Sequence, residues 1–129
     1  MSPTIKQTVI FKVPPHEVYE ALMDSKKHAA FSGGKARMSR EVGGDFTAYD
    51  GYIDGKNIEL VPDKKIVQDW RASDWPAGYY SRVTFNLIPV HEGTRLDFTH
   101  ANVPEGREDE YKQGWIDNYW EPMKKFLEK

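Results

Sequence analysis

Hydrophobic and polar residues alternate along most of this chain with the period of two that is typical of half-buried β-strands. In the first such segment, Thr4–Val13, Ile5 and Phe11 fall on one face and Lys6 and Lys12 fall on the other. Six further segments are predicted to be strands: Lys35–Glu41, Asp45–Tyr49, Tyr52–Val61, Lys65–Ser73, Tyr79–Val90 and Arg95–Asn102.

Turn-forming residues separate these strands. Turns or bulges are predicted at Gly43-Gly44, Asp50-Gly51, Asp54-Gly55 and Pro62-Asp63, and longer loops at Asp74–Gly78 and His91–Thr94. Because short turns join antiparallel neighbours, the strands are expected to form an antiparallel meander.

Two short helices interrupt the strand series after the first strand. Pro14 and Pro15 end that strand, and Pro15 suits the first turn of a helix that continues to Met23. Asp24 is a predicted N-cap for a second helix ending at Ser32-Gly33-Gly34.

A longer helix is predicted from Glu108 to about Leu127, and Pro122 is expected to kink it or to loosen one of its turns. Carboxylates at its start and lysines at its end suit the helix dipole. Its apolar residues recur every three or four positions and form a stripe: Tyr111, Trp115, Ile116, Tyr119, Met123, Phe126 and Leu127. Gly114 is expected to let this helix approach the sheet closely. The predicted fold class is therefore α+β, with a curved seven-stranded antiparallel sheet wrapped around the C-terminal helix.

Composition narrows the function classes. A length of 129 residues suits one domain, residues 1–129. A formal net charge of −2 does not favour nucleic acid as a partner. The chain has no cysteine, no apolar run near the ~18 residues of a membrane span, and no charged-then-apolar leader in residues 1–13. We therefore expect a cytoplasmic protein without a membrane span.

The polar residues do not form a recognisable catalytic motif. Alternation places Asp50, Gln68, Ser81 and His100 toward the interior, and His100 is the only one of the four histidines expected there. No histidine pair has the spacing of a helical zinc motif, and no serine lies in a nucleophile-elbow sequence. Metal sites, cofactors and catalytic residues are therefore not predicted.

The order of strand, two helices, six strands and helix resembles the helix-grip fold of the START and birch-pollen-allergen-like (SRPBCC) superfamily. Within that superfamily, several segments are similar to the C-terminal domain of the family named for the activator of the heat-shock protein 90 ATPase: Val13–Leu22, Gly43–Phe46, Asp50–Gly55, Leu60–Arg71, Gln113–Trp115 and Tyr119-Trp120. This resemblance covers about Ile5 to Phe126 and implies a chaperone as partner. The family's eukaryotic co-chaperones also carry a separate N-terminal domain that does much of the chaperone binding, and nothing in this sequence precedes Met1. The resemblance therefore implies the fold more directly than it implies activation of the chaperone's ATPase.

Two functional hypotheses follow. The first is a non-enzymatic protein that holds a small hydrophobic ligand between sheet and C-terminal helix, in a cavity lined by Met38, Phe46, Trp70, Phe85, Phe98, His100, Trp115 and Tyr119. The second is a co-chaperone-like regulator of heat-shock protein 90 ATPase activity in the stress response, which acts through its surface. Trp75, predicted in an exposed loop, is its expected contact residue. A cavity of several hundred Å³ favours the ligand, and a filled interior favours the partner. An enzyme is the least expected class.

Overall fold

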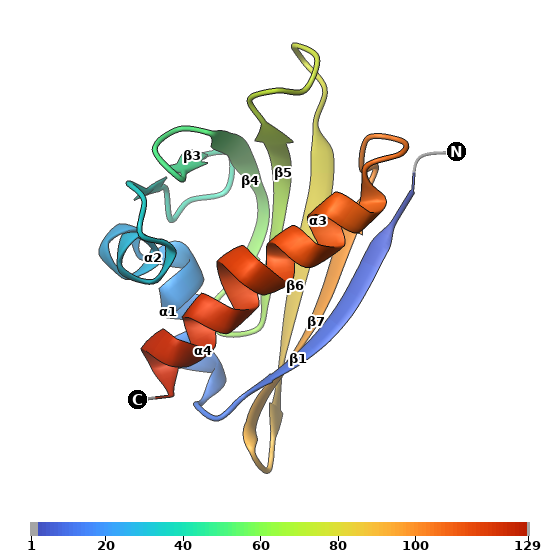
Figure 1. Cartoon of the computed structure of the whole chain (residues 1–129). Coiled ribbons are helices and arrows are strands. Elements are labelled where there is room, and N and C mark those ends of the chain that lie inside the picture. Colours follow the sequence, from blue (N-terminus) through green and yellow to red (C-terminus); the bar gives the residue numbers. More distant parts are fainter. Residues whose placement is uncertain (1–2, 129) are drawn as a thin grey trace.

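The computed structural model describes residues 3–128. Seven antiparallel strands form one sheet, as predicted, and their order in the sheet is β1-β7-β6-β5-β4-β3-β2 (Figure 1). The strands are β1 (Ile5–Phe11), β2 (Arg37–Met38), β3 (Asp45–Ala48), β4 (Ile53–Val61), β5 (Lys65–Ala72), β6 (Ser81–Val90) and β7 (Gly93–Ala101). β1 lies at one edge of the sheet and pairs with β7, so the first and last strands of the chain are neighbours.

Two details of the strands differ from the prediction. β2 has two residues rather than seven, because the chain after Met38 leaves the ladder and its Ser39 and Glu41 carbonyls accept hydrogen bonds from the Asn57 side chain. Asp54-Gly55 is not a turn but lies in the regular β4–β5 ladder, and the actual bulge occurs between Asn57 and Glu59.

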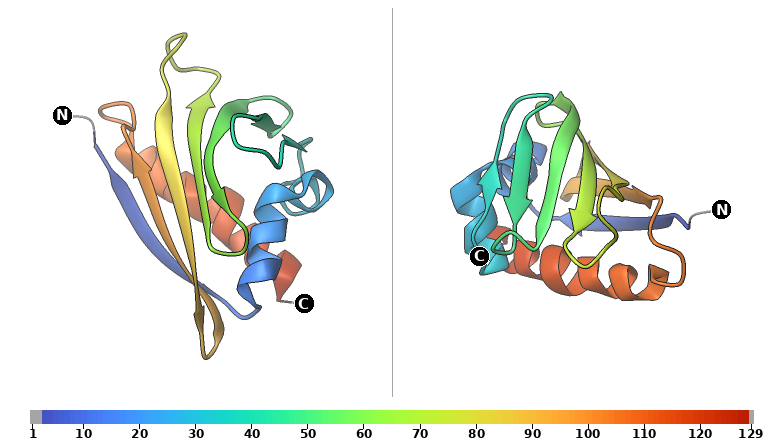
Figure 2. Two further views of the ribbon diagram at one scale, coloured as in Figure 1. Left: turned by 180° about the vertical axis from the view of Figure 1, so that it is seen from behind. Right: turned by 90° about the horizontal axis from the view of Figure 1, so that it is seen from above.

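The two short helices follow β1 as predicted. α1 (Pro15–Met23) begins with a proline in its first turn. α2 (Ser25–Ser32) is capped by Asp24, whose carboxylate accepts the Lys27 backbone N–H at 3.0 Å. It ends at Gly33, whose φ of 78° is the left-handed conformation that favours glycine. Both helices pack at one end of the curved sheet, beside the C-terminal helix (Figure 2).

The C-terminal helix crosses the concave face of the sheet in three parts: α3 (Glu108–Trp115), a π-helical turn η1 (Ile116–Trp120) and α4 (Glu121–Leu127) (Figures 1 and 2). The predicted irregularity near Pro122 is therefore a π turn, which precedes the proline. Trp115, Tyr119 and Met123 of the apolar stripe are buried against the sheet. None of the helices in residues 3–128 has the length and hydrophobicity needed to span a bilayer.

Candidate functional site

The cavity predicted from the sequence is filled. Six of its eight predicted residues do surround one space between sheet and helix: Met38, Phe46, Trp70, Phe85, Trp115 and Tyr119. That space measures only about 10 Å³, which is near the minimum for one water molecule. Phe98 and His100 do not line it, and both pack directly against the Trp115 ring. The interior thus brings the predicted residues together without leaving room for a ligand.

A larger pocket opens beside the filled interior, between the C-terminal helix and strands β4 and β5. It measures about 340 Å³, within the usual range of small-molecule sites. Its lining residues are Tyr49, Tyr52, Ile53, Trp70, Glu110, Tyr111, Gly114, Trp115, Asn118 and Tyr119. Only Trp70, Trp115 and Tyr119 were among the predicted site residues, because sequence alternation identifies buried positions and not the side chains at the mouth.

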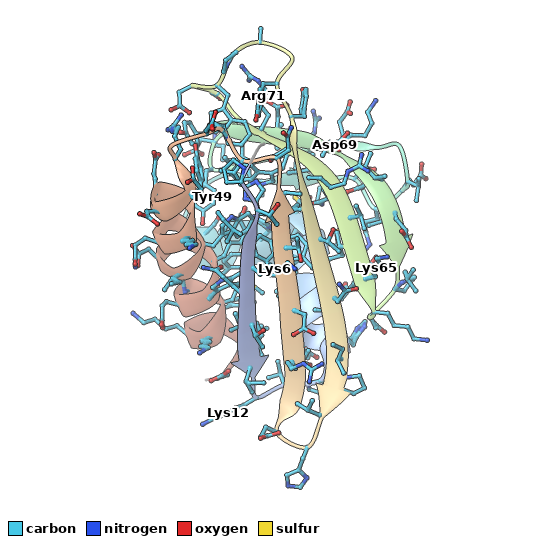
Figure 3. All side chains as sticks on the ribbon, turned by 90° about the vertical axis from the view of Figure 1, so that its right-hand side faces the viewer. Lys6, Lys12, Tyr49, Lys65, Asp69 and Arg71 are labelled. Carbon is cyan, nitrogen blue, oxygen red and sulfur yellow. The ribbon has the colours of Figure 1, made fainter. Side chains whose placement is uncertain are left out.

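Tyr49 bridges the two walls of this pocket. It follows β3 and lies beside the C-terminal helix, where its hydroxyl donates a hydrogen bond to the Asn118 carbonyl and its ring meets the Tyr119 ring edge-on at 5.7 Å (Figure 3). Burial raises the pKa of Tyr49 to about 12, so the hydroxyl stays protonated as a donor. Its φ of 52° is left-handed, an uncommon conformation for an aromatic residue that is often found at functional sites.

The acceptor that Tyr49 uses is left free by Pro122. In an α-helix the carbonyl of residue 118 would accept the N–H of residue 122, and proline has no N–H. In η1 the backbone instead bonds with longer spacing, for example from Glu121 N–H to Ile116 carbonyl. The hydrogen bonds of the π turn and the Tyr49 hydroxyl together provide donors for the backbone carbonyls of Ile116 and Asn118. Single π turns in helices occur frequently at functional sites.

Gly114 has a different role from the one predicted. A Cβ built at this position would meet only the Asn118 side-chain nitrogen, at 3.8 Å, so the glycine is not needed for close contact with the sheet. Gly114 lines the pocket. Because glycine has no side chain, nothing at position 114 projects into the opening of the pocket.

Trp75 is buried, contrary to the prediction of an exposed contact residue. It has 3% of its surface exposed, because the β5–β6 loop folds back and places the indole between the rings of Trp70, Tyr79 and Tyr111. The Arg71 guanidinium holds the loop by donating to the Trp75 carbonyl at 2.6 Å. The aromatic residues that do remain exposed nearby are Tyr52 and Tyr80, at 44% and 41%.

Ser81 and His100 form a close pair that is not set up for nucleophilic catalysis. The Trp115 indole N–H donates to His100 Nδ1 at 3.0 Å, so Nδ1 is unprotonated and the proton of the neutral ring is on Nε2. Nε2 lies 2.7 Å from Ser81 Oγ, and the serine hydroxyl donates to the Trp70 carbonyl. Burial lowers the pKa of His100 to about 3. The imidazole is therefore a donor to the serine and not a base for it.

Three further polar residues were misplaced or missed by the sequence prediction. His28 is buried as well as His100, and its Nδ1 donates to the Leu22 carbonyl at 3.2 Å. Asp50 is exposed in the turn after β3, where it accepts the Lys35 backbone N–H. Asn57 is fully buried and bonds to Gln68, which was correctly placed inside. Asn57 continues the alternation of buried positions along β4 from Ile53 and Gly55, and the bulge begins only after it, so this pattern could have placed Asn57 inside.

Charged groups gather at the rim of the pocket. Arg107 donates to Glu110 at 2.8 and 3.0 Å and to Asp74 at 2.9 Å, while its guanidinium stands 5.3 Å from the centre of the Tyr111 ring. The Tyr52 hydroxyl donates to Asp74 at 2.8 Å. Within residues 3–128, no group of three or more acidic, histidine or cysteine side chains is arranged to hold a metal ion. The arrangement of the pocket suits binding by aromatic and polar contacts.

Comparison with known proteins places this geometry in a family. The family model described as "Activator of Hsp90 ATPase homolog 1-like protein" matches residues 12–128. The human Activator of 90 kDa heat shock protein ATPase homolog 1 is 32% identical to this chain. The aligned region covers 94% of this chain and 35% of the human protein. The Hsp90 co-chaperone of Saccharomyces cerevisiae is 26% identical over 88% of this chain, which spans 34% of it. The chain thus spans about a third of the length of the curated relatives it matches.

A solved structure agrees over nearly the full length of both chains. The crystal structure of an HSP90 activator from Plasmodium falciparum superposes with a TM-score of 0.91 at 31% identity and covers 96% of this chain and 95% of that one.

Proposed function

The chain belongs to the family of Activator of Hsp90 ATPase homolog 1-like proteins, and we propose on that basis that it binds Hsp90 and regulates its ATP turnover. The match over residues 12–128 carries this proposal. The interior supports it, because the space between sheet and helix where the ligand was predicted holds only about 10 Å³. Because the filled interior has no room for a ligand, we expect the protein to act on Hsp90 through its surface.

We propose that the contact surface includes the two exposed tyrosines near the β5–β6 loop. The Tyr80 hydroxyl donates to Asp54 at 3.0 Å, as the Tyr52 hydroxyl does to Asp74. Each of these carboxylates also forms an ion pair with an arginine. Arg71 Nη1 lies 3.8 Å from Asp54 Oδ2, and Arg107 Nη2 lies 2.9 Å from Asp74 Oδ2. Tyrosine and arginine are enriched at the energetic centres of interfaces, and tyrosines held in place lose little conformational entropy on binding.

The experiment is a titration of purified Hsp90 with this protein while ATP hydrolysis is followed. We expect turnover to change with protein concentration and to reach a plateau when the chaperone is saturated. The matched control is an equal concentration of Trp70→Ala protein, which should lose the packed core that presents the surface. An unchanged turnover, together with no complex in sedimentation velocity at the same concentrations, would reject the proposal.

The open pocket supports a second function, the binding of a small molecule. Its volume of about 340 Å³ and its ring-lined walls are the observation that favours it. The pocket opens at the mouth of the helix–sheet interface and not in the filled interior, so Phe98 and His100 would not touch its ligand. Isothermal titration with small apolar molecules should give a stoichiometry near one. Binding that survives Gly114→Leu unchanged would place the ligand elsewhere.

A further inference from the structure

The lining of the pocket has an unusual balance of charge. Among its ten lining residues Glu110 is the only charged one, and no lysine, arginine or histidine is present. The guanidinium that contacts Glu110, that of Arg107, is shared between Glu110 and Asp74. Two carboxylates bonded to one guanidinium leave a net negative charge at the rim.

The walls of the pocket are mostly aromatic. Six of the ten lining residues carry aromatic rings: Tyr49, Tyr52, Trp70, Tyr111, Trp115 and Tyr119. Aromatic rings attract cations through the negative potential of their faces, and several rings around one site are the usual means of holding a substituted ammonium group. A carboxylate ligand would instead lose its water next to Glu110 without gaining a cationic partner.

We propose that this pocket selects organic cations of the substituted ammonium class, recognised by its aromatic walls together with the Glu110 carboxylate. The proposal rests on the second function given above, the binding of a small molecule, and adds its chemical class. Long-chain fatty acids and other anions are the class that it disfavours.

Three probes of similar shape separate charge from shape: benzyltrimethylammonium, its neutral carbon isostere neopentylbenzene, and the anion phenylacetate. Because Trp70 and Trp115 line the pocket, binding should be followed by tryptophan emission excited near 295 nm, where none of the probes absorbs. We expect the cation to bind about 3- to 30-fold more tightly than the neutral isostere, and phenylacetate to bind most weakly. Equal or tighter binding of the neutral probe overturns the class while the binding function stands. Failure of all three probes overturns both.

A pair of carboxylate variants tests the role of Glu110. Glu110→Gln removes the only charge in the lining, whereas Glu121→Gln removes an exposed carboxylate from the same C-terminal helix outside the pocket. Both changes alter the net charge equally. We expect the preference for the cation over its isostere to shrink in Glu110→Gln and to stay in Glu121→Gln. A preference that is the same in both variants overturns the assignment to Glu110.

Discussion

Trp75 donates its indole N–H to the Tyr111 hydroxyl at 2.8 Å and so ties the β5–β6 loop to the C-terminal helix. The two rings also meet edge-on with their centroids 5.5 Å apart. A residue that sequence reasoning assigned to the surface is thus one of the links between the sheet and the helix that covers it.

Trp75→Ala is therefore expected to destabilise the protein by about 3–5 kcal/mol, as much as Trp70→Ala, because each truncation removes a buried indole from the aromatic core. Denaturant unfolding at constant slope measures both losses. Tyr80→Ala serves as the exposed control and should cost under about 1 kcal/mol. A midpoint for Trp75→Ala close to that of Tyr80→Ala would contradict the burial of Trp75.

Tyr49→Phe is expected to cost about 1 kcal/mol by removing the donor to the Asn118 carbonyl. A double-mutant cycle with Pro122→Ala gives the sharper result, because alanine at 122 restores an N–H that can reach the same carbonyl. We expect the cost of Tyr49→Phe to fall in that background. Strictly additive free energies would show that the tyrosine and the proline act independently.

The two buried histidines predict acid sensitivity. Burial lowers the pKa of His28 to about 4 and that of His100 to about 3, against about 6.5 in the unfolded chain. The unfolded state therefore binds more protons below pH 6.5, so stability is complete above that pH and is lost as the pH falls toward 4. Each histidine contributes a slope of about 1.4 kcal/mol per pH unit.

Unfolding free energies measured between about pH 5 and 5.5, above the folded-state pKa of His28 and below its unfolded value, check this prediction. His28→Gln should reduce the slope by about one proton even though the variant is less stable. His16→Gln is the control, because Asp63 raises the pKa of this exposed histidine and it is protonated in both states at those pH values. An identical slope in the wild type and in His28→Gln would show that the imidazole is accessible to protons in the folded state.

Gly114→Ala is expected to stabilise the protein by about 0.5–1 kcal/mol, since the position is helical and a Cβ there meets no close neighbour. Gly114→Leu should instead fill the mouth of the pocket and weaken probe binding by at least about tenfold while the protein stays folded. Thermal melts and the probe titration measure the two effects. Loss of stability in Gly114→Ala would return the glycine to the close-packing role first predicted.

The succession of strands and helices along the chain and the buried stripe of the C-terminal helix follow from local patterns, and the structure confirms them. Alternation places Phe11 and Lys12 on opposite faces, and a spacing of three or four places Trp115, Tyr119 and Met123 on one face. The predicted site was only partly correct, because local patterns do not give the volume between elements. Six of the predicted residues meet, but their side chains fill the space that they surround.

The remaining site residues depend on long-range contacts that no local pattern records. Tyr49 reaches the Asn118 carbonyl across 69 positions, and Trp75 reaches Tyr111 across 36. From local sequence alone, a tryptophan in a loop is predicted to be exposed, because the distant residues that cover it are not known. The one local signal available was Pro122, which indicates an unpaired carbonyl one turn earlier in the helix.

The most direct test of the proposed function is the ATP turnover of Hsp90 measured with wild-type protein, Tyr80→Ser and Ile10→Ser. Both substitutions replace side chains of similar exposure, 41% and 38%, on different strands or loops of the sheet. We expect wild type and Ile10→Ser to change the turnover equally, and Tyr80→Ser, shown to be folded by circular dichroism, to have a weaker effect. If the wild-type protein at saturating concentration leaves the turnover unchanged, it does not regulate Hsp90 and the proposed function is wrong.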